Sequence, residues 1–155
     1  VVLAGDSAGG NLALALLLAL RARGGRQAAR ALLVSPWVDL TMPGASFVEN
    51  DPFDFGTRDV LDAQARAYAN EIALEDPRIS PTYAKLEGLP PLFVIAGDAE
   101  LLRDDILAFV AKAKAAQLDV TLHLAPDMPH NAPVFAAYHP AADAALEAAA
   151  KFVRG

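Results

Sequence analysis

The sequence opens on a short stretch whose residue types suit covalent catalysis by serine. Gly5, Ser7 and Gly9 form a Gly-x-Ser-x-Gly turn. Small apolar residues precede this turn, and a long apolar run over residues 12–20 follows it. A strand, a tight turn and a helix in this order form the setting of a nucleophile elbow, which lifts the serine hydroxyl clear of the backbone. We expect both glycines to be required because side chains there would collide with the strand and the helix. A simpler interpretation is that Ser7 only caps the helix.

A catalytic serine needs a base within hydrogen-bond reach and a third group that orients the base. The chain has three histidines. His130 lies in a proline-flanked loop after the last expected strand, where its side chain can turn back over the sheet edge. His123 falls inside an alternating strand and His139 precedes the last helix, so both favour surface roles. We therefore select His130 as the base, and no histidine spacing indicates a metal site.

The acid is harder to choose. Asp98 and Glu100 both follow the third expected strand closely. Asp98 is nearer to the strand end and is the commoner residue type for this role, whereas Glu100 has the longer reach. Spacing alone leaves both alternatives open.

Short apolar strands alternate with helices along the chain, which predicts an α/β fold with a parallel sheet. We expect strands over 1–4, 31–35, 91–96 and 119–124, and helices over 11–23, 58–71, 101–117 and 140–153. Ligands bind beyond the carboxyl ends of parallel strands, so serine, acid and histidine should converge at that edge. The first helix is apolar nearly all round, which predicts that it is covered on both sides. The alternating last strand should lie near a sheet edge.

The stretch from about residue 42 to 89 differs from the rest of the chain. Prolines, glycines and aromatic residues surround a single expected helix, with Thr57 as its N-cap. Connections of this length usually cover a site, so we interpret the stretch as a lid-like insertion, with extra surface structure as the alternative. Trp37 and Phe53 are candidates for the wall of a substrate pocket, although ordinary packing explains them equally well.

The composition limits the classes of protein to which the chain can belong. With 155 residues, 54% of them apolar and 21% charged, the chain suits one globular domain with a substantial core. A net charge of −6 argues against nucleic acid or an anionic membrane surface as a partner. The apolar run over 12–20 is too short to span a membrane. The absence of cysteine excludes disulfides and thiol catalysis.

The beginning of the chain is unusual for a natural domain. Val1 already lies inside a strand pattern, with no Met and no cap before it. We interpret residues 1–155 as the C-terminal part of a single domain whose N-terminal part is missing. A targeting segment would lie in the missing part, so localisation stays open, with the cytoplasm as the default.

Five stretches in order carry a resemblance to a known family. They are Gly5–Asn11, Ser35–Thr41, Pro77–Pro81, Leu89–Leu92 and Met128–His130. These stretches resemble the hormone-sensitive-lipase group of α/β-hydrolases, and the match runs in register along the whole chain. The order serine, acid, histidine is also that of α/β-hydrolases. The resemblance implies the C-terminal half of an α/β-hydrolase fold, starting at the nucleophile strand.

The resemblance also implies an activity. It predicts a carboxylic-ester hydrolase that acts on small or medium acyl esters through an acyl-enzyme, without a cofactor. Matching residues 101–104 to the run that follows the acid in this group puts Glu100 at the acid position. The predicted triad is therefore Ser7, Glu100 and His130, with Asp98 as the alternative acid. The backbone N–H of Ala8 would supply one oxyanion donor. The other donors in this group lie far upstream, so the chain alone is expected to be inactive.

Two other outcomes are compatible with the same fold. The group resembles plant hormone receptors that bind a small molecule without hydrolysing it, but loss of the catalytic histidine marks those, and His130 is present. The second outcome is that the chain is an inactive fragment. Members of the group often dimerise through their last strand and helix, so pairing through residues 120–124 is a further expectation.

Overall fold

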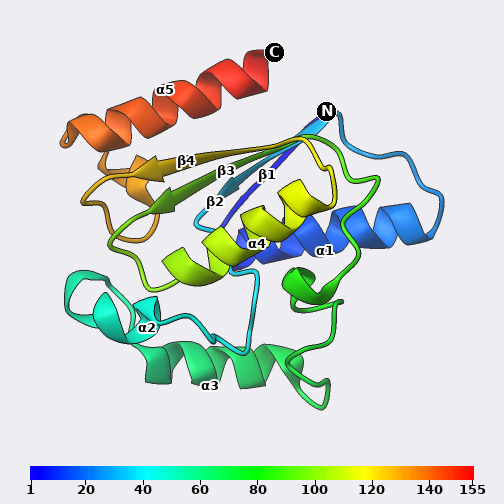
Figure 1. Cartoon of the computed structure of the whole chain (residues 1–155), viewed down its shortest axis with the longest axis horizontal. Helices are drawn as coiled ribbons and strands as arrows, with labels where there is room; N and C mark the ends of the chain where they lie inside the picture. The colour runs from blue at the N-terminus through cyan, green and yellow to red at the C-terminus, as the bar shows by residue number, and fades with distance from the viewer.

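The computed structural model describes every residue from 1 to 155, and its centre is a parallel sheet (Figure 1). The four strands lie in the order β1-β2-β3-β4, so each strand pairs with its neighbour in the sequence. The strands are β1 (Val2–Asp6), β2 (Arg30–Val34), β3 (Leu92–Gly97) and β4 (Val120–Ala125). Parallel neighbours need a connection that crosses back over a face of the sheet, and the helices supply these crossings.

Helices cover both faces of this sheet. They are α1 (Ala8–Ala22), α2 (Ser46–Glu49), α3 (Arg58–Ala69), α4 (Arg103–Ala115) and α5 (Pro140–Arg154). Leu14 of α1 and Phe109 of α4 belong to the larger core on one face. On the other face, Phe93 and Ile95 of β3 pack with Ala145 of α5. Figure 1 shows α5 alone on its side of the sheet and the other helices on the opposite side. No helix is long and apolar enough to cross a bilayer.

The sheet confirms the expected topology, including the edge position of β4. All six residues of β3, between β2 and β4, are buried, as its unbroken apolar sequence predicts. β4 pairs only with β3, and Leu124 is 41% exposed. One prediction about the helices is confirmed only in part. The β2–β3 connection contacts α1, with Asn11 bonded to Ile79, but Leu12 and Leu16 of α1 are still 56% and 47% exposed.

The connection from β2 to β3 contains more structure than the single predicted helix. Besides α3 it holds α2 and two 3-10 turns, η1 (Asp51–Phe53) and η2 (Pro81–Tyr83). Thr57 caps α3 as predicted, with its side chain accepting a hydrogen bond from the Val60 N–H at 3.4 Å. Ala65 and Ala69 of α3 join the larger core, so this connection forms an outer layer on the α1 and α4 side (Figure 1).

Two cations hold the returning end of this connection. Arg21, in the last turn of α1, donates to the carbonyls of Lys85 and Glu87 at 2.8 and 2.5 Å. Lys112, near the end of α4, donates to the carbonyls of Thr82 and Ala84 at 2.6 and 2.8 Å. Segments without regular structure need such partners for their backbone groups. The outer layer is therefore tied to the helices that cover the sheet.

Candidate active site

Ser7 lies in the turn between β1 and α1 in a strained backbone conformation. Its φ is 51° and its ψ is −120°, a region that residues with a side chain rarely occupy. The turn is held by hydrogen bonds from the Ser7 N–H to the Val34 carbonyl at 2.9 Å and from the Trp37 N–H to the Ser7 carbonyl at 3.0 Å. The Ser7 side chain makes no capping bond to α1. Ser7 occupies the N-cap position by its backbone, with its carbonyl accepting from the Asn11 N–H at 3.2 Å, but its hydroxyl does not cap the helix.

The glycines around Ser7 have unequal roles. A Cβ on Gly5 would lie 2.2 Å from the Gly9 carbonyl oxygen, so only glycine fits there. A Cβ on Gly9 would meet nothing closer than an Asp6 carboxylate oxygen at 3.8 Å, so the expected collision at Gly9 was wrong. The second close approach is at Gly10, where a Cβ would lie 2.7 Å from the Pro36 Cβ. The helix start thus packs directly on the chain that leaves β2.

His130 and Glu100 lie together at the carboxyl edge of the sheet. The His130 Nδ1 is 3.6 Å from the Glu100 Oε2, longer than a normal hydrogen bond and within range of charge interaction. Glu100 is fully buried, and its Oε1 has no hydrogen-bond partner. Burying a carboxylate oxygen that has no hydrogen-bond partner costs folding free energy. Such a group is typical of a site where its charge has a function.

Ser35 is a member of the site that the sequence did not reveal. It is fully buried just after β2, with a φ of 44°. Its hydroxyl donates to the Glu100 Oε2 at 2.5 Å and accepts from the Asn131 N–H at 3.0 Å. Ser35 therefore joins the acidic side chain to the residue that follows His130. The available signal was a hydroxyl directly after a strand, at the edge where ligands bind.

Burial and charge act in opposite directions on the two titratable groups. Burial raises the pKa of Glu100, and its contacts with His130 and Ser35 oppose this only in part. Burial lowers the pKa of His130, but the Glu100 carboxylate, with Asp54 and Asp6, outweighs this and raises the pKa overall. The surroundings of the imidazole thus favour its protonated form, which a general base must become during the reaction.

Ser7 and His130 line the same small cavity. Its volume is about 40 Å³, and its other lining residues are Asp54, Gly56, Leu61, Leu101 and Leu102. The Ser7 and His130 side chains are not hydrogen-bonded to each other in this conformation. Catalytic hydrogen bonds are often long in unliganded proteins and tighten only when substrate is bound. The geometry therefore brings the predicted nucleophile and base to one place.

Asp98 lies in the same loop as Glu100, and its carboxylate makes no hydrogen bond or ion pair. Its side chain is partly exposed. The backbone of Asp98 fixes the loop: its N–H donates to the Ala125 carbonyl at 3.0 Å, and its carbonyl accepts from Asn50 and Arg103, each at 3.2 Å. Asp98 therefore supports this loop through its main chain and not through its carboxylate.

The other histidines lie outside the site. His139 caps α5, with its Nδ1 accepting from the Ala141 N–H at 3.2 Å. His123 lies on β4 and is partly exposed. Both positions agree with the surface roles expected from the sequence.

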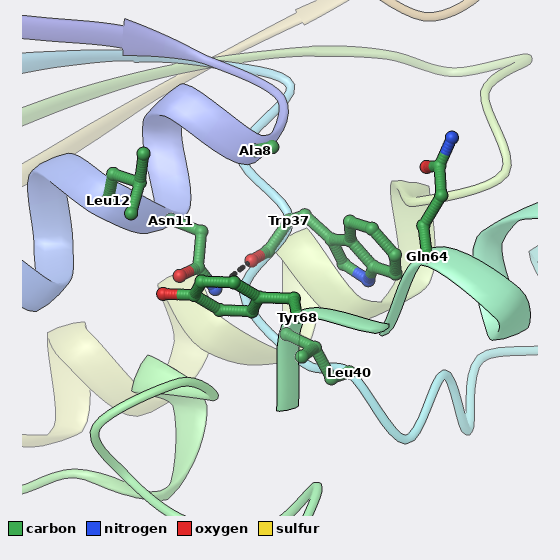
Figure 2. A pocket seen from close by; sticks show the side chains of 7 residues that line it. All are labelled: Ala8, Asn11, Leu12, Trp37, Leu40, Gln64 and Tyr68. Carbon is green, nitrogen blue, oxygen red and sulfur yellow. Dashed lines mark hydrogen bonds between the residues drawn. The ribbon is translucent and has the colours of Figure 1, made fainter. Parts of the chain in front are cut away.

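A larger cavity of about 280 Å³ opens beside the Ser7 turn (Figure 2). It is lined by Ala8, Asn11, Leu12, Trp37, Leu40, Gln64 and Tyr68. Ala8 is the first residue of α1, so its N–H has no partner within the helix. Trp37 lines the cavity as the sequence suggested. Phe53 does not line it: the residue is 67% exposed in η1.

Asn11 holds the wall of this cavity in place. It is 3% exposed, and its Nδ2 donates to the carbonyls of Trp37 and Ile79, each at 2.7 Å. Figure 2 shows the first of these bonds beside the Trp37 and Tyr68 rings. One side chain thus links three stretches that resemble the family motifs: the serine turn, the segment after β2 and residues 77–81.

The sequence of this chain is similar to those of known proteins. The family model described as "alpha/beta hydrolase fold" matches residues 1–134. An esterase of Acinetobacter venetianus is 37% identical over 98% of this chain and 51% of its own length. An acetyl-hydrolase of Streptomyces hygroscopicus is 40% identical over 99% of this chain and 52% of its own length.

Solved structures of similar proteins match this chain over nearly its whole length. The crystal structure of an esterase from the bacterial hormone-sensitive lipase family superimposes with a TM-score of 0.93 at 39% identity, over 99% of this chain and 52% of that one. The chain spans about half the length of the curated relatives it matches. It belongs to the α/β-hydrolase fold family, as a hormone-sensitive-lipase-like member.

Proposed function

We propose that the whole protein hydrolyses carboxylic esters with Ser7 as nucleophile, His130 as base and Glu100 as the acid that orients the base. The observation that carries the proposal is the strained Ser7 turn at a cavity that His130 also lines, with the Oε2 of buried Glu100 3.6 Å from the His130 Nδ1. The esterase and acetyl-hydrolase named among the relatives support this activity.

In the proposed reaction, the His130 Nε2 takes the proton of the Ser7 hydroxyl as its Oγ attacks the ester carbonyl. The tetrahedral intermediate then releases the alcohol, which receives its proton from His130. This leaves an acyl-enzyme on Ser7. Water, deprotonated by His130, attacks the acyl group; the bond to the Ser7 Oγ then breaks, Oγ takes the proton from His130, and the carboxylic acid leaves. Glu100 faces Nδ1, which keeps a proton there and leaves Nε2 free to accept one.

The negative oxygen of the tetrahedral intermediate needs hydrogen-bond donors. We assign the Ala8 N–H as one donor, because it follows the nucleophile and is unpaired at the start of α1. The positive end of the helix dipole adds to the same effect. A preorganised donor of this kind is worth about 10²–10³ in rate.

The larger cavity supports small or medium acyl esters as substrates. Its volume of about 280 Å³ is at the lower end of ligand pockets, and Leu12, Trp37 and Tyr68 give it mostly apolar walls. Ala8 links this cavity to the Ser7 turn. We therefore propose that Trp37 contacts the acyl group, and we make no such assignment for the exposed Phe53.

Hydrolysis of p-nitrophenyl esters by the whole protein tests the proposal. Wild-type protein should release p-nitrophenol fastest from short and medium acyl chains. Ser7→Ala should reduce kcat by at least about 10³-fold, because the covalent route is lost. Turnover that is unchanged in Ser7→Ala would exclude the serine mechanism.

A matched pair of variants tests the choice of acid. Glu100→Gln removes the charge beside the His130 Nδ1 and should lower kcat by several orders of magnitude, about 10⁴-fold at most. Asp98→Asn changes a side chain whose loop is held by its backbone, so activity should change by less than about twofold. Glu100 is the wrong acid if only the Asp98 variant loses activity.

A further inference from the structure

The segment from Asn50 to Phe55 lies across the two loops that carry Glu100 and His130. Asn50 is 7% exposed, and its Nδ2 donates to the carbonyls of Glu100 and Asp98 at 2.8 and 3.2 Å. The Phe55 ring stacks on Phe135, in the turn after His130, with 5.8 Å between ring centroids. We call this segment, residues 50–55, the strap. It belongs to the long connection between β2 and β3.

Asp54 makes the central contacts of the strap. Its Oδ1 accepts from the His130 N–H at 3.0 Å, and its Oδ2 accepts from the Leu101 N–H at 2.8 Å. The Oδ1 also accepts from the N–H of Phe55 at 2.9 Å. One carboxylate therefore fixes the backbone of His130 and of the residue directly after Glu100.

A carboxylate is the side chain that suits these contacts. Both of its oxygens are acceptors, so it satisfies backbone N–H groups on two separate loops. An asparagine in the same place has one acceptor oxygen, and its NH₂ group would face one of the two N–H donors. Hydrogen bonds from N–H groups to a charged acceptor are also shorter and stronger than neutral ones.

Asp54 also contributes negative charge at the site. It lines the small cavity together with Ser7 and His130. The charged groups that act on the His130 imidazole are three carboxylates: Glu100 after β3, Asp54 in the strap and Asp6 at the end of β1. No cation is among them, so each carboxylate favours the imidazolium.

We propose that Asp54 is a positioning residue of the hydrolytic reaction. Its carboxylate clamps the backbone of the base and of the acid loop, so that the two keep their relative positions, and its charge stabilises the imidazolium formed in the transition state. The inference rests on the proposed function, because positioning has a meaning only if His130 and Glu100 act together on Ser7. The strap thereby gives the long β2–β3 connection a part in catalysis.

The test is Asp54→Asn in the whole protein, with Asp51→Asn as the matched control. Asp51 lies in the same strap and is exposed, with no side-chain hydrogen bond. Asp54→Asn should lower kcat for p-nitrophenyl butyrate by about 10–100-fold with KM changed by less than about threefold, because misplacement of the base by a fraction of an ångström is costly. Asp51→Asn should leave both unchanged.

The pH dependence separates positioning and charge from a merely structural role. In Asp54→Asn, the acid limb of kcat/KM should move to lower pH by a few tenths of a unit, because one carboxylate that favours the imidazolium is gone. NMR titration of the His130 imidazole should show the same shift without requiring turnover. Asp54→Glu, which keeps the charge, should restore the wild-type limb even where kcat stays low.

Each result supports or overturns the inference. A normal kcat in Asp54→Asn overturns it, and so does a lower kcat with an unshifted His130 titration, since this indicates general destabilisation only. Thermal unfolding of each variant identifies that second case. If Ser7→Ala keeps wild-type turnover, the proposed function fails. The His130 titration then still shows separately whether Asp54 acts on the imidazole.

Discussion

Replacing Ser35 with alanine tests how far the acid of the site depends on its support. The substitution removes the hydroxyl that donates to the Glu100 Oε2 at 2.5 Å and accepts from the Asn131 N–H at 3.0 Å. The Glu100 Oε1 already has no partner, so the buried carboxylate would keep only its contact with His130 at 3.6 Å. The free-energy cost of the substitution therefore arises mainly at the buried Glu100 carboxylate.

The size of the effect follows from that geometry. A hydrogen bond to a charged group contributes about 1.5–3 kcal/mol. If losing this hydrogen bond destabilises the transition state by the same free energy, kcat drops by about tenfold to 100-fold, because each factor of ten corresponds to about 1.36 kcal/mol. The Ser35 hydroxyl also lowers the pKa of Glu100, so its removal raises that pKa further. The acid limb of kcat/KM, which needs both a neutral His130 and an ionised Glu100, should therefore move to higher pH.

The assay is the pH profile of p-nitrophenyl butyrate hydrolysis, combined with urea unfolding. Ser80→Ala is the control, because Ser80 is equally buried and its Oγ accepts from the Leu40 N–H at 2.9 Å, with no bond to Glu100 or the His130 loop. Both variants should lose about 1–3 kcal/mol of unfolding free energy. Only Ser35→Ala should lose kcat and shift the limb. Equal kinetic losses in the two variants, or an unshifted limb in Ser35→Ala, would refute the reasoning.

Two further predictions concern stability. Burial and the nearby charge of Asp39 raise the pKa of Asp105 to about 7. An unfolded aspartate has a pKa of about 3.9. Between these two values the folded state keeps a proton that the unfolded state has lost, so the free energy of unfolding should fall as pH rises through this range. Asp105→Asn should remove this pH dependence, which is measured as the difference between the Tm at about pH 5 and the Tm at about pH 8. An equal Tm difference in the wild-type protein and in Asp105→Asn would contradict the raised pKa of Asp105. Gly10→Ala would place a Cβ 2.7 Å from the Pro36 Cβ and should destabilise the fold by about 1–3 kcal/mol. Gly9→Ala should have little effect in the same urea titration, and a reversed order would show that the helix start does not pack on Pro36 as described.

The local pattern of apolar residues was enough to predict the strands and helices that carry the site. The run of small apolar residues before Ser7 and the leucines after it predict a strand and a helix, and the alternation of β4 predicts an edge strand. The prediction failed where an element is too short to show a period. The four residues of α2 and the turns η1 and η2 have no periodic signal, so one helix was expected where several elements lie.

The surroundings of the acid could not be read from spacing. Asp98 and Glu100 leave the same strand, and only the path of the loop determines that Glu100 is fully buried beside His130 while Asp98 is partly exposed. The contacts that hold these groups join distant parts of the chain. Ser35 and Glu100 are 65 residues apart, and Asp54 and His130 are 76 apart. Neither pair has any local signature.

The sequence by itself determined the order of strands and helices, the Ser7 turn and the loop in which His130 lies, because these depend on backbone preferences and on the spacing of apolar residues over a few turns. The tertiary structure alone decided which side chains surround Glu100 and His130, which glycine must stay small and which face of α1 stays uncovered. Those outcomes depend on contacts between segments that meet only after the sheet has formed. Hydrogen bonds such as those of Ser35 and Asp54 therefore belong to the fold as a whole and to no single motif.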